Sequence, residues 1–265
     1  MQQNELYDVV ILGASPEGIA LGELLNTQSN IKVALISKDF KNISNKHKLE
    51  NIKLISGEVI LINYFKGLIS FTFKNNTSIF GKKAVIAVGS RPIKSEIKNT
   101  NICYKPADLE ETSKTKPVVI FGNNLDAANY AIELSKKFKY VYLCTKEFKL
   151  NCDLPRKKKI ANLANVVHLP GCKIMTCKND KIGKLQEVTL DTYDTIRCSA
   201  LIMALGKLPD TTNLAKRVFD VDQDGYIITK AFNETTKVPN LFAIGACSDH
   251  NTKQSIKVVY NALIK

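Results

Sequence analysis

The sequence predicts an α/β protein of two similar halves, each with a parallel sheet and an inserted β-meander. The main observation is an apolar strand that ends in a glycine turn, at residues 9–13 and again at residues 118–122. Helical periodicity and a second strand follow each turn, and this order produces parallel strands joined by right-handed crossovers. A chain of 265 residues is also long enough for two domains.

The helix after each glycine turn is predicted from its apolar spacing. The first begins at Pro16, because proline suits the first helical position, and is expected to bury Ile19, Ala20, Leu24 and Leu25. The second is expected to bury one apolar stripe, formed by Ala127, Ala128, Ala131, Ile132 and Leu134. Each helix therefore packs one face against a sheet.

Two further similarities relate the halves. The strands expected at residues 31–36 and 140–144 run into the near-copies LISKDFK and LCTKEFK. Later, AVIAVGSRP at residues 84–92 parallels ALIMALGKLP at residues 200–209. Because all three pairs occur in the same order in both halves, we interpret the chain as an internal repeat.

Between the second and third similarities, strand-like segments predict a meander in each half. They lie at residues 53–55, 58–63, 68–73 and 78–80 in the first half, and at residues 166–169, 185–190 and 195–198 in the second. A further strand at residues 241–245 and a helix at residues 254–263 are expected to return to the first domain. We therefore predict domains at residues 1–104 and 105–238, with residues 239–265 completing the first.

Composition and charge exclude several classes. The chain is 45% apolar and 24% charged, and no apolar run is long enough to span a bilayer, so neither a disordered nor a membrane protein is expected. The net charge of +13 comes from scattered lysines, with one tight block at residues 156–159. No zinc spacing or aromatic platform accompanies that block, so nucleic-acid binding is not expected. A small acidic protein is the favoured partner.

The cysteines and histidines suggest no metal or thiol chemistry. None of the seven cysteines forms a CxxC pair, and the three histidines are far apart in the sequence. We expect free thiols in a reducing, cytoplasmic setting with no leader and no metal site. His250, Cys247 and Cys103 are isolated candidates, and no catalytic residue is assigned.

Each glycine turn is a candidate phosphate site. Backbone N–H groups at a helix N-terminus attract a pyrophosphate, and the matching fingerprint is G-x-G-x-x-G/A. Gly13 and Gly18 fit its ends in the first half, as Gly122 and Ala127 do in the second. The middle glycine is replaced by Ser15 and by Asn124. A side chain there either pushes the phosphate away from the backbone or hydrogen bonds to it.

The second strand of each half ends without the acid that usually contacts an adenosine ribose. Ser37 and Thr145 stand there, followed by Lys38 and Lys146. This arrangement tolerates a 2′-phosphate, so Lys146 is a candidate for pairing with NADPH. The alternative is that it is a solvated charge at the end of a strand.

At these motifs the chain resembles the low-molecular-weight thioredoxin reductases and related flavoproteins, including the thioredoxin-reductase-like ferredoxin–NADP reductases. The resemblance covers nearly the whole chain and rests on residues 8–18, 84–92, 118–127, 201–213, 224–227 and 238–245. It implies two Rossmann-like dinucleotide-binding domains, with an NAD(P) domain inserted into a split FAD-type domain. It also implies the cofactors FAD and NADPH, and allows a homodimer.

The resemblance assigns binding residues in each domain. The residues assigned to FAD are Gly13, Ser15, Pro16, Gly18, Ser37, Val59, Ala87, Val88, Gly89, Gly245 and Gln254. Those assigned to NADPH are Gly122, Asn124, Ala127, Lys146 and Gly206.

The chain also departs from the resembled pattern. The expected redox CxxC is absent, and the corresponding stretch reads CYKPAD at residues 103–108. The loop and helix that normally cover the flavin are missing, since residues 40–51 lead almost directly into the meander. Ala246 stands where a carboxylate is expected after Gly245. Together with Ser15 and Ser37, these changes predict weak or lost FAD binding.

Two functions therefore stay open. The first is an NAD(P)H-dependent flavoprotein that passes electrons to an external acceptor, such as a ferredoxin, a flavodoxin, a quinone or a small disulfide. The second is a non-catalytic relative that acts as a nucleotide-binding or protein-interaction module.

Overall fold

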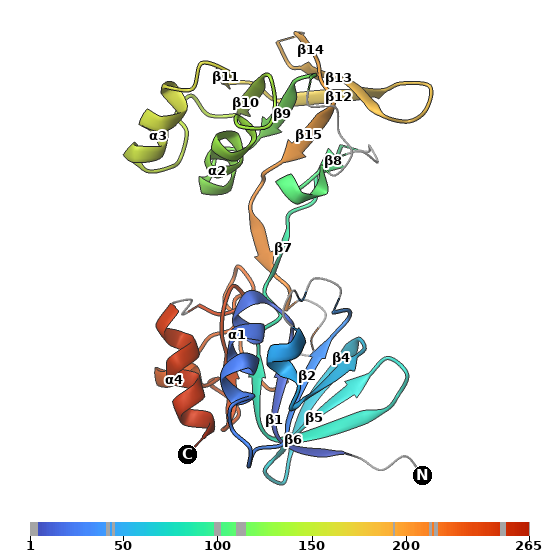
Figure 1. The fold of residues 1–265 in the computed structure, drawn as a ribbon, viewed down its shortest axis with the longest axis vertical. Helices are drawn as coiled ribbons and strands as arrows, with labels where there is room; N and C mark the ends of the chain where they lie inside the picture. Colours follow the sequence, from blue (N-terminus) through green and yellow to red (C-terminus); the bar gives the residue numbers. More distant parts are fainter. Residues whose placement is uncertain are drawn as a thin grey trace. The chain divides into compact units, whose positions relative to one another are not determined.

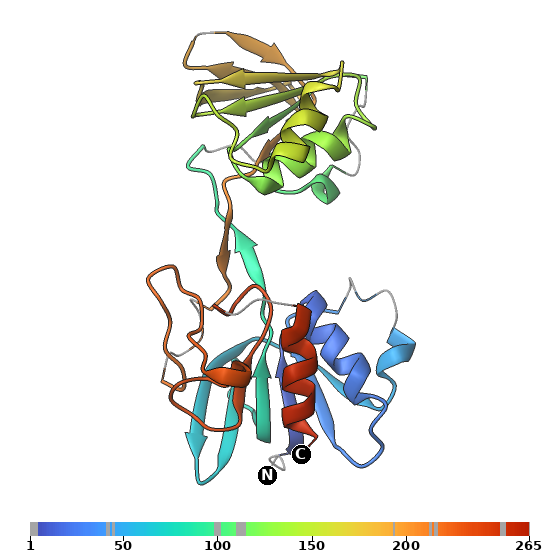
Figure 2. The ribbon, with the colours of Figure 1, turned by 90° about the vertical axis from the view of Figure 1, so that its left-hand side faces the viewer.

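We describe the protein from a computed structural model, which describes residues 5–40, 43, 46–97, 102–109, 115–192, 194–211, 214, 217–249 and 253–264. The chain forms two compact units, Met1–Arg91 with Leu208–Lys265, and Pro92–Lys207. Figures 1 and 2 show helices beside sheets in both units, which confirms the predicted α/β class with parallel sheets. No helix within the described ranges is both long and apolar enough to span a membrane.

The sheet of the first unit has seven strands. In spatial order, they are β3 (Ile52–Ser56), β2 (Val33–Ser37), β1 (Leu6–Leu12), β6 (Ser78–Ile86), β5 (Leu68–Phe73) and β4 (Val59–Phe65), while β17 (Leu241–Ala243) also pairs with β6. β3, β2, β1, β6 and β17 are parallel, and β4–β5–β6 form the antiparallel meander. The long β6 belongs to both parts, since its first half pairs with β5 and its second half with β17.

Side chains on alternate positions of β1 enter two different cores. Val9 and Ile11 pack with the helices α1 (Pro16–Leu25) and α4 (Lys253–Leu263), while Val10 and Leu12 pack on the meander side. Figure 2 shows α1 and α4 side by side over the sheet. Short 3-10 turns, Lys46–Leu49 and Ala231–Asn233, complete the unit.

The buried stripe of α1 differs from the prediction. Gly18, Leu21, Gly22 and Leu25 are buried, whereas Leu24 is 38% exposed. The glycines at 18 and 22 decide this face, because they leave room for the sheet and its neighbours. In the second unit, the predicted stripe of α2 (Leu125–Leu134) is buried at Ala127, Ala128, Ala131 and Leu134.

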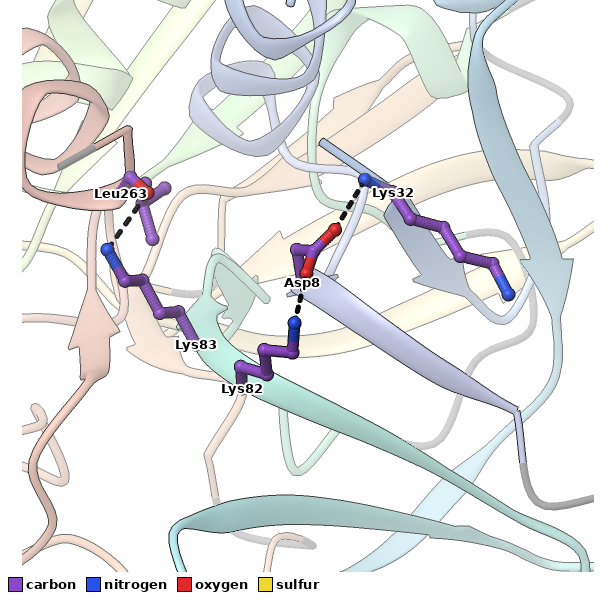
Figure 3. Close-up of polar contacts among 5 residues, drawn as sticks. All are labelled: Asp8, Lys32, Lys82, Lys83 and Leu263. Carbon is purple, nitrogen blue, oxygen red and sulfur yellow. Dashed lines mark hydrogen bonds and ion pairs between the residues drawn. The ribbon is translucent and has the colours of Figure 1, made fainter. Parts of the chain in front are cut away.

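Lys82 and Lys83 of the central strand β6 make polar contacts with neighbouring elements of the first unit (Figure 3). Lys83 of β6 donates hydrogen bonds of 3.0 Å to the carbonyl groups of Ala262 and Leu263, at the end of α4. Asp8 accepts a hydrogen bond from the backbone of Lys32 at 2.9 Å and pairs with Lys82 at 2.7 Å. A cation at the last carbonyls of a helix stabilises its C-terminus, so Lys83 holds α4 against the sheet.

The second unit repeats the pattern with five parallel strands. Their order is β11 (Val166–Pro170), β10 (Val141–Thr145), β9 (Val118–Phe121), β15 (Ala200–Met203) and β8 (Ile102–Cys103). A separate antiparallel sheet forms the meander, with β12 (Ile174–Asn179), β13 (Leu185–Leu190) and β14 (Thr195–Arg197). The sequence did not predict α3 (Leu154–Ala161), although the Asp153 carboxylate caps it at the backbone N–H of Arg156.

The unit limits differ from the predicted boundaries at 104/105 and 238/239. β8 joins the second sheet because Ile102 pairs with Leu201. Residues 208–238 belong to the first unit, where Phe219 and Ile227 are buried in the meander-side core. The connecting strands β7 (Ser90–Pro92) and β16 (Lys207–Pro209) pair with each other.

Candidate functional site

The first cradle, formed by the turn between β1 and α1 and the backbone around it, requires its glycines. Gly13 has a φ of +114°, and a Cβ there would lie 2.2 Å from the carbonyl oxygen of Ala87. A Cβ on Gly18 would lie 2.3 Å from the carbonyl oxygen of Gly13. The predicted FAD residues Gly13, Gly18, Ala87 and Gly89 therefore meet at the carboxyl end of the sheet, where open α/β folds bind ligands.

Ser15 uses its side chain to cap the helix. Its hydroxyl accepts a hydrogen bond from the backbone N–H of Gly18 at 3.2 Å, and Pro16 takes the first helical position. This N–H is one of the four that the helix start leaves available to an anion. The serine therefore reduces the number of donors that this cradle offers to a phosphate.

Glu17 is a site residue that the sequence reasoning missed. A Cβ on Gly245, in the loop after β17, would lie 2.7 Å from Glu17 Oε2 and 2.9 Å from its Cδ. The Glu17 carboxylate therefore lies against the backbone of Gly245, within the predicted flavin site. The signal was an acid inside the glycine fingerprint, directly before Gly18.

Ser37 lies beside a cavity of about 180 Å³ at the carboxyl end of β2. Phe40 and Ile43 line it and pack against the core around α1 and α4. Typical small-molecule pockets measure about 300–1,000 Å³, so the cavity is small for a nucleotide. The shortened connection thus brings apolar side chains to this end of the site.

Two ion pairs to Glu58 lie at the neighbouring end of the predicted flavin site. Lys38 pairs with Glu58 at 3.2 Å, and Lys74 lies 3.8 Å from the other oxygen of Glu58. The hydrogen bond and charge of Lys38, followed by the charge of Lys74, lower the pKa of Glu58. The predicted residue Val59 is buried in β4 opposite Phe73. Lys38 is therefore already engaged by the protein.

The other residues assigned to FAD lie on the meander side, after β17 and on α4. Val88 packs against the meander-side core, Gly245 follows β17, and Gln254 is exposed in the first turn of α4. His250 lies outside the described residues. Cys247 is buried, and burial raises its pKa to about 11, with a smaller contribution from the charge of Glu17. Burial therefore makes the Cys247 thiol a poor nucleophile.

The second cradle, formed by the turn between β9 and α2 and the backbone around it, has the same backbone construction. A Cβ on Gly122 would lie 2.2 Å from the carbonyl oxygen of Ala204. Asn124 caps α2 by accepting the backbone N–H of Ala127 at 2.9 Å, and its amide donates to the Ala204 carbonyl at 2.8 Å. Gly206 lies near the same amide nitrogen. The predicted residues Gly122, Asn124, Ala127 and Gly206 are thus brought together.

An ion pair distinguishes the second cradle from the first. Asp126 occupies the fingerprint position that Glu17 holds in the first, and Lys207 pairs with it at 2.9 Å. The hydrogen bond that Lys207 donates to the Asp126 carboxylate raises the pKa of Lys207. Among the described residues, Glu17 has no such ion-pair partner. Within the part of the chain that the structure describes, the acid is therefore paired with a cation in the second unit and not in the first.

At the end of β10, Thr145 is buried and Lys146 is exposed. The Thr145 hydroxyl donates to the carbonyl of Glu147 at 2.7 Å and lies 2.9 Å from His168 Nε2. A hydroxyl has one proton, so His168 Nε2 donates to Thr145, and burial lowers the pKa of this histidine. Within the described residues, Lys146 has no carboxylate partner, and the neighbouring Phe148 is 81% exposed.

No disulfide joins any of the seven cysteines, and Cys103 lies in β8. Burial, followed by the charge of Asp108, raises the pKa of Cys103 to about 11. In the part of the chain that the structure describes, no group of His, Cys, Asp and Glu could hold a metal.

Comparison with known proteins identifies the class. Residues 7–264 match the family "Pyridine nucleotide-disulphide oxidoreductase", and the chain belongs to this family. The thioredoxin reductase of Borreliella burgdorferi is 25% identical, covering 98% of this chain and 90% of that protein. The thioredoxin reductase of Mycoplasma genitalium is 24% identical, with 94% and 90% covered. The expected resemblance to the thioredoxin reductases is therefore confirmed.

Solved structures agree on the fold. The thioredoxin reductase of T. acidophilum has a TM-score of 0.80 at 19% identity, covering 98% of this chain and all (100%) of that one. The Lactococcus lactis thioredoxin reductase has a TM-score of 0.79 at 17% identity, with 97% of both chains covered. The pair of Rossmann-like domains predicted from the repeat is confirmed.

The first unit fits the family's FAD poorly at the pyrophosphate. The glycine turn is retained, but Ser15 occupies a backbone donor and the Glu17 carboxylate lies on Gly245. A dianionic group placed there meets the negative charge of Glu17, which has no ion-pair partner in the described ranges. The second unit fits a nicotinamide dinucleotide better, because Lys207 compensates Asp126 and Lys146 is exposed.

Proposed function

We propose that this protein is an NAD(P)H-dependent oxidoreductase whose second unit holds the nicotinamide nucleotide. The observation that carries this proposal is the charge-compensated cradle around Gly122, with Asp126 paired to Lys207. NADPH supplies a hydride when it is bound. The first unit corresponds to the flavin-binding domain of the family, and the second to its NAD(P) domain.

In this proposal, the start of α2 and the side chains of Asn124 and Lys146 bind different parts of the nucleotide or hold the site in place. The free N–H groups at the start of α2 face the pyrophosphate, while Asn124 keeps the helix start fixed to Ala204. Lys146, at the exposed end of β10, pairs with the 2′-phosphate of NADPH. The second unit thus binds and orients the electron donor.

We expect FAD to bind the first unit weakly and to dissociate readily. The poor fit of the first cradle supports this, and the absent CxxC requires an external electron acceptor. The net charge of +13 favours a small acidic redox protein as that acceptor. A cytoplasmic location remains a prediction from the cysteine usage, and a homodimer also remains a prediction.

A non-catalytic nucleotide-binding module is the second candidate. The Glu17 carboxylate in the first cradle favours it, because a negative charge at the phosphate site is tolerated only in a unit that no longer has to bind flavin. In that case, the protein binds NADPH without oxidising it.

One assay separates these candidates. NADPH consumption is followed by absorbance with purified protein, an artificial one-electron acceptor, and FAD added in increasing amounts. We expect consumption that rises with FAD concentration and exceeds a protein-free control. NADPH binding by calorimetry without any FAD-dependent consumption would favour the non-catalytic module.

A further inference from the structure

We infer that Glu17 is a built-in negative charge that keeps flavin pyrophosphate from being retained in the first cradle. This inference rests on the proposed assignment of the first unit to flavin. It concerns a residue of this chain that lies between Pro16 and Gly18, inside the phosphate-binding turn.

The position of the carboxylate supports the inference. Glu17 lies in the first turn of α1, and its Oε2 is so close to Gly245 that a Cβ there would be only 2.7 Å away. The carboxylate therefore connects the helix start with the loop after β17. Any dinucleotide using the N–H groups of this turn has its phosphates next to this carboxylate.

The charge balance supports it independently. The equivalent acid of the second unit, Asp126, is paired with Lys207 at 2.9 Å. None of the ion pairs among the described residues includes Glu17, although Glu23 on the same helix is paired with Lys48 at 3.8 Å. The helix dipole stabilises the Glu17 carboxylate in the place where it would otherwise attract a phosphate.

The capping interaction adds to the effect. Ser15 Oγ already accepts the N–H of Gly18, so the cradle has fewer donors with which to offset the repulsion. Two like charges that lie close together repel several times more strongly near a protein surface than in bulk water. Removing the charge should therefore strengthen FAD binding by about tenfold or more.

The test is a fluorescence titration of FAD into the full chain and into Glu17→Gln and Glu17→Ala. We expect both variants to bind FAD about tenfold or more tightly than the unmodified protein. Riboflavin, which has no phosphate, should bind all three proteins equally. Glu23→Ala, a matched loss of one acid on the same helix, should leave FAD binding unchanged.

Several outcomes would overturn the inference. These are unchanged or weaker FAD binding by Glu17→Gln, no measurable binding by either variant, or an equal gain for riboflavin. Weaker binding would mean that Glu17 holds the flavin instead of repelling it. Thermal melting of each variant confirms that it is folded. The titration measures affinity alone, so a protein without NADPH oxidation would refute the proposed function but not this inference.

Discussion

The two cradles of this protein have nearly the same backbone and opposite charge balance. In both, the first glycine of the fingerprint lies so close to a neighbouring strand that a Cβ would approach a carbonyl oxygen to 2.2 Å. In both, a polar side chain caps the helix and an acid follows in the first turn. Only the second acid, Asp126, has a lysine partner among the described residues.

The residues that follow β2 and β10, the second strands of the two units, also differ in their partners. Lys38 is paired with Glu58, and Phe40 packs against the core. In the near-copy of this sequence, Lys146 and Phe148 are both exposed. The comparison shows that the two repeats keep the same backbone while differing in their charged partners, and in our proposal these partners determine which repeat binds a dinucleotide.

The largest expected effect concerns what the cradles share. Gly13→Ala and Gly122→Ala should each destabilise the protein by about 3 kcal/mol or more, because the added Cβ clashes with a backbone carbonyl. Denaturant unfolding measures this. Gly67→Ala is the control, since its φ of +83° is strained for alanine but its surroundings are open. It should cost about 1 kcal/mol, and equal losses at all three positions would contradict the role of the close approach.

The fold was predictable because the backbone features that the two cradles share leave a clear pattern in the sequence. Strand, glycine turn and helix recur in order, and each step has a backbone cause that a short sequence expresses. The domain boundaries were less predictable. β8 joins the second sheet through one short strand pairing, at Ile102 and Leu201. Such a short strand leaves almost no recognisable hydrophobic pattern in the sequence.

The sequence predicted which residues gather at the two glycine turns, but not the charges around them. Ser15 and Asn124 were expected near phosphates, yet both side chains turn back to cap their helices. The pairing of Asp126 with Lys207 joins residues 81 positions apart, and only the folded chain brings them together. The same limit hid Glu17, whose contact with Gly245 depends on the final strand.

The next largest effect is expected on nucleotide affinity, when the lysine that follows β10 or β2 is removed. Lys146→Ala should weaken NADPH binding by about 1.5–3 kcal/mol and leave NADH binding almost unchanged, since only NADPH carries the 2′-phosphate. Calorimetric titration of both nucleotides measures this. Lys38→Ala, at the equivalent position of the first unit, should change neither affinity. Equal losses of NADPH and NADH would rule out the proposed pairing.

A smaller difference is expected between the two helix caps. Asn124→Ala removes two hydrogen bonds, to Ala127 and Ala204, and should cost about 2 kcal/mol. Ser15→Ala removes one bond and should cost about 1 kcal/mol. Denaturant unfolding of both variants decides the order, and a costlier Ser15→Ala would show that the caps are not used as described.

The smallest expected effect is at Cys103. Its pKa is raised to about 11 by burial, so the thiol stays protonated at neutral pH and becomes reactive only as the pH approaches that value. Alkylation of the folded protein should therefore be slow at neutral pH and accelerate in alkali. Cys103→Ser should leave any NADPH oxidation unchanged. Thioredoxin reduction that disappears in this variant would mean that Cys103 is a redox residue after all.

The central claim is that the first cradle has lost its hold on flavin while the second remains fit for a nicotinamide nucleotide. The most direct measurement is the visible absorbance spectrum of the protein, purified after growth with excess riboflavin and then passed through gel filtration. The charge balance at Glu17 predicts a colourless protein that still binds NADPH. A stoichiometric flavin band retained through gel filtration would contradict the account.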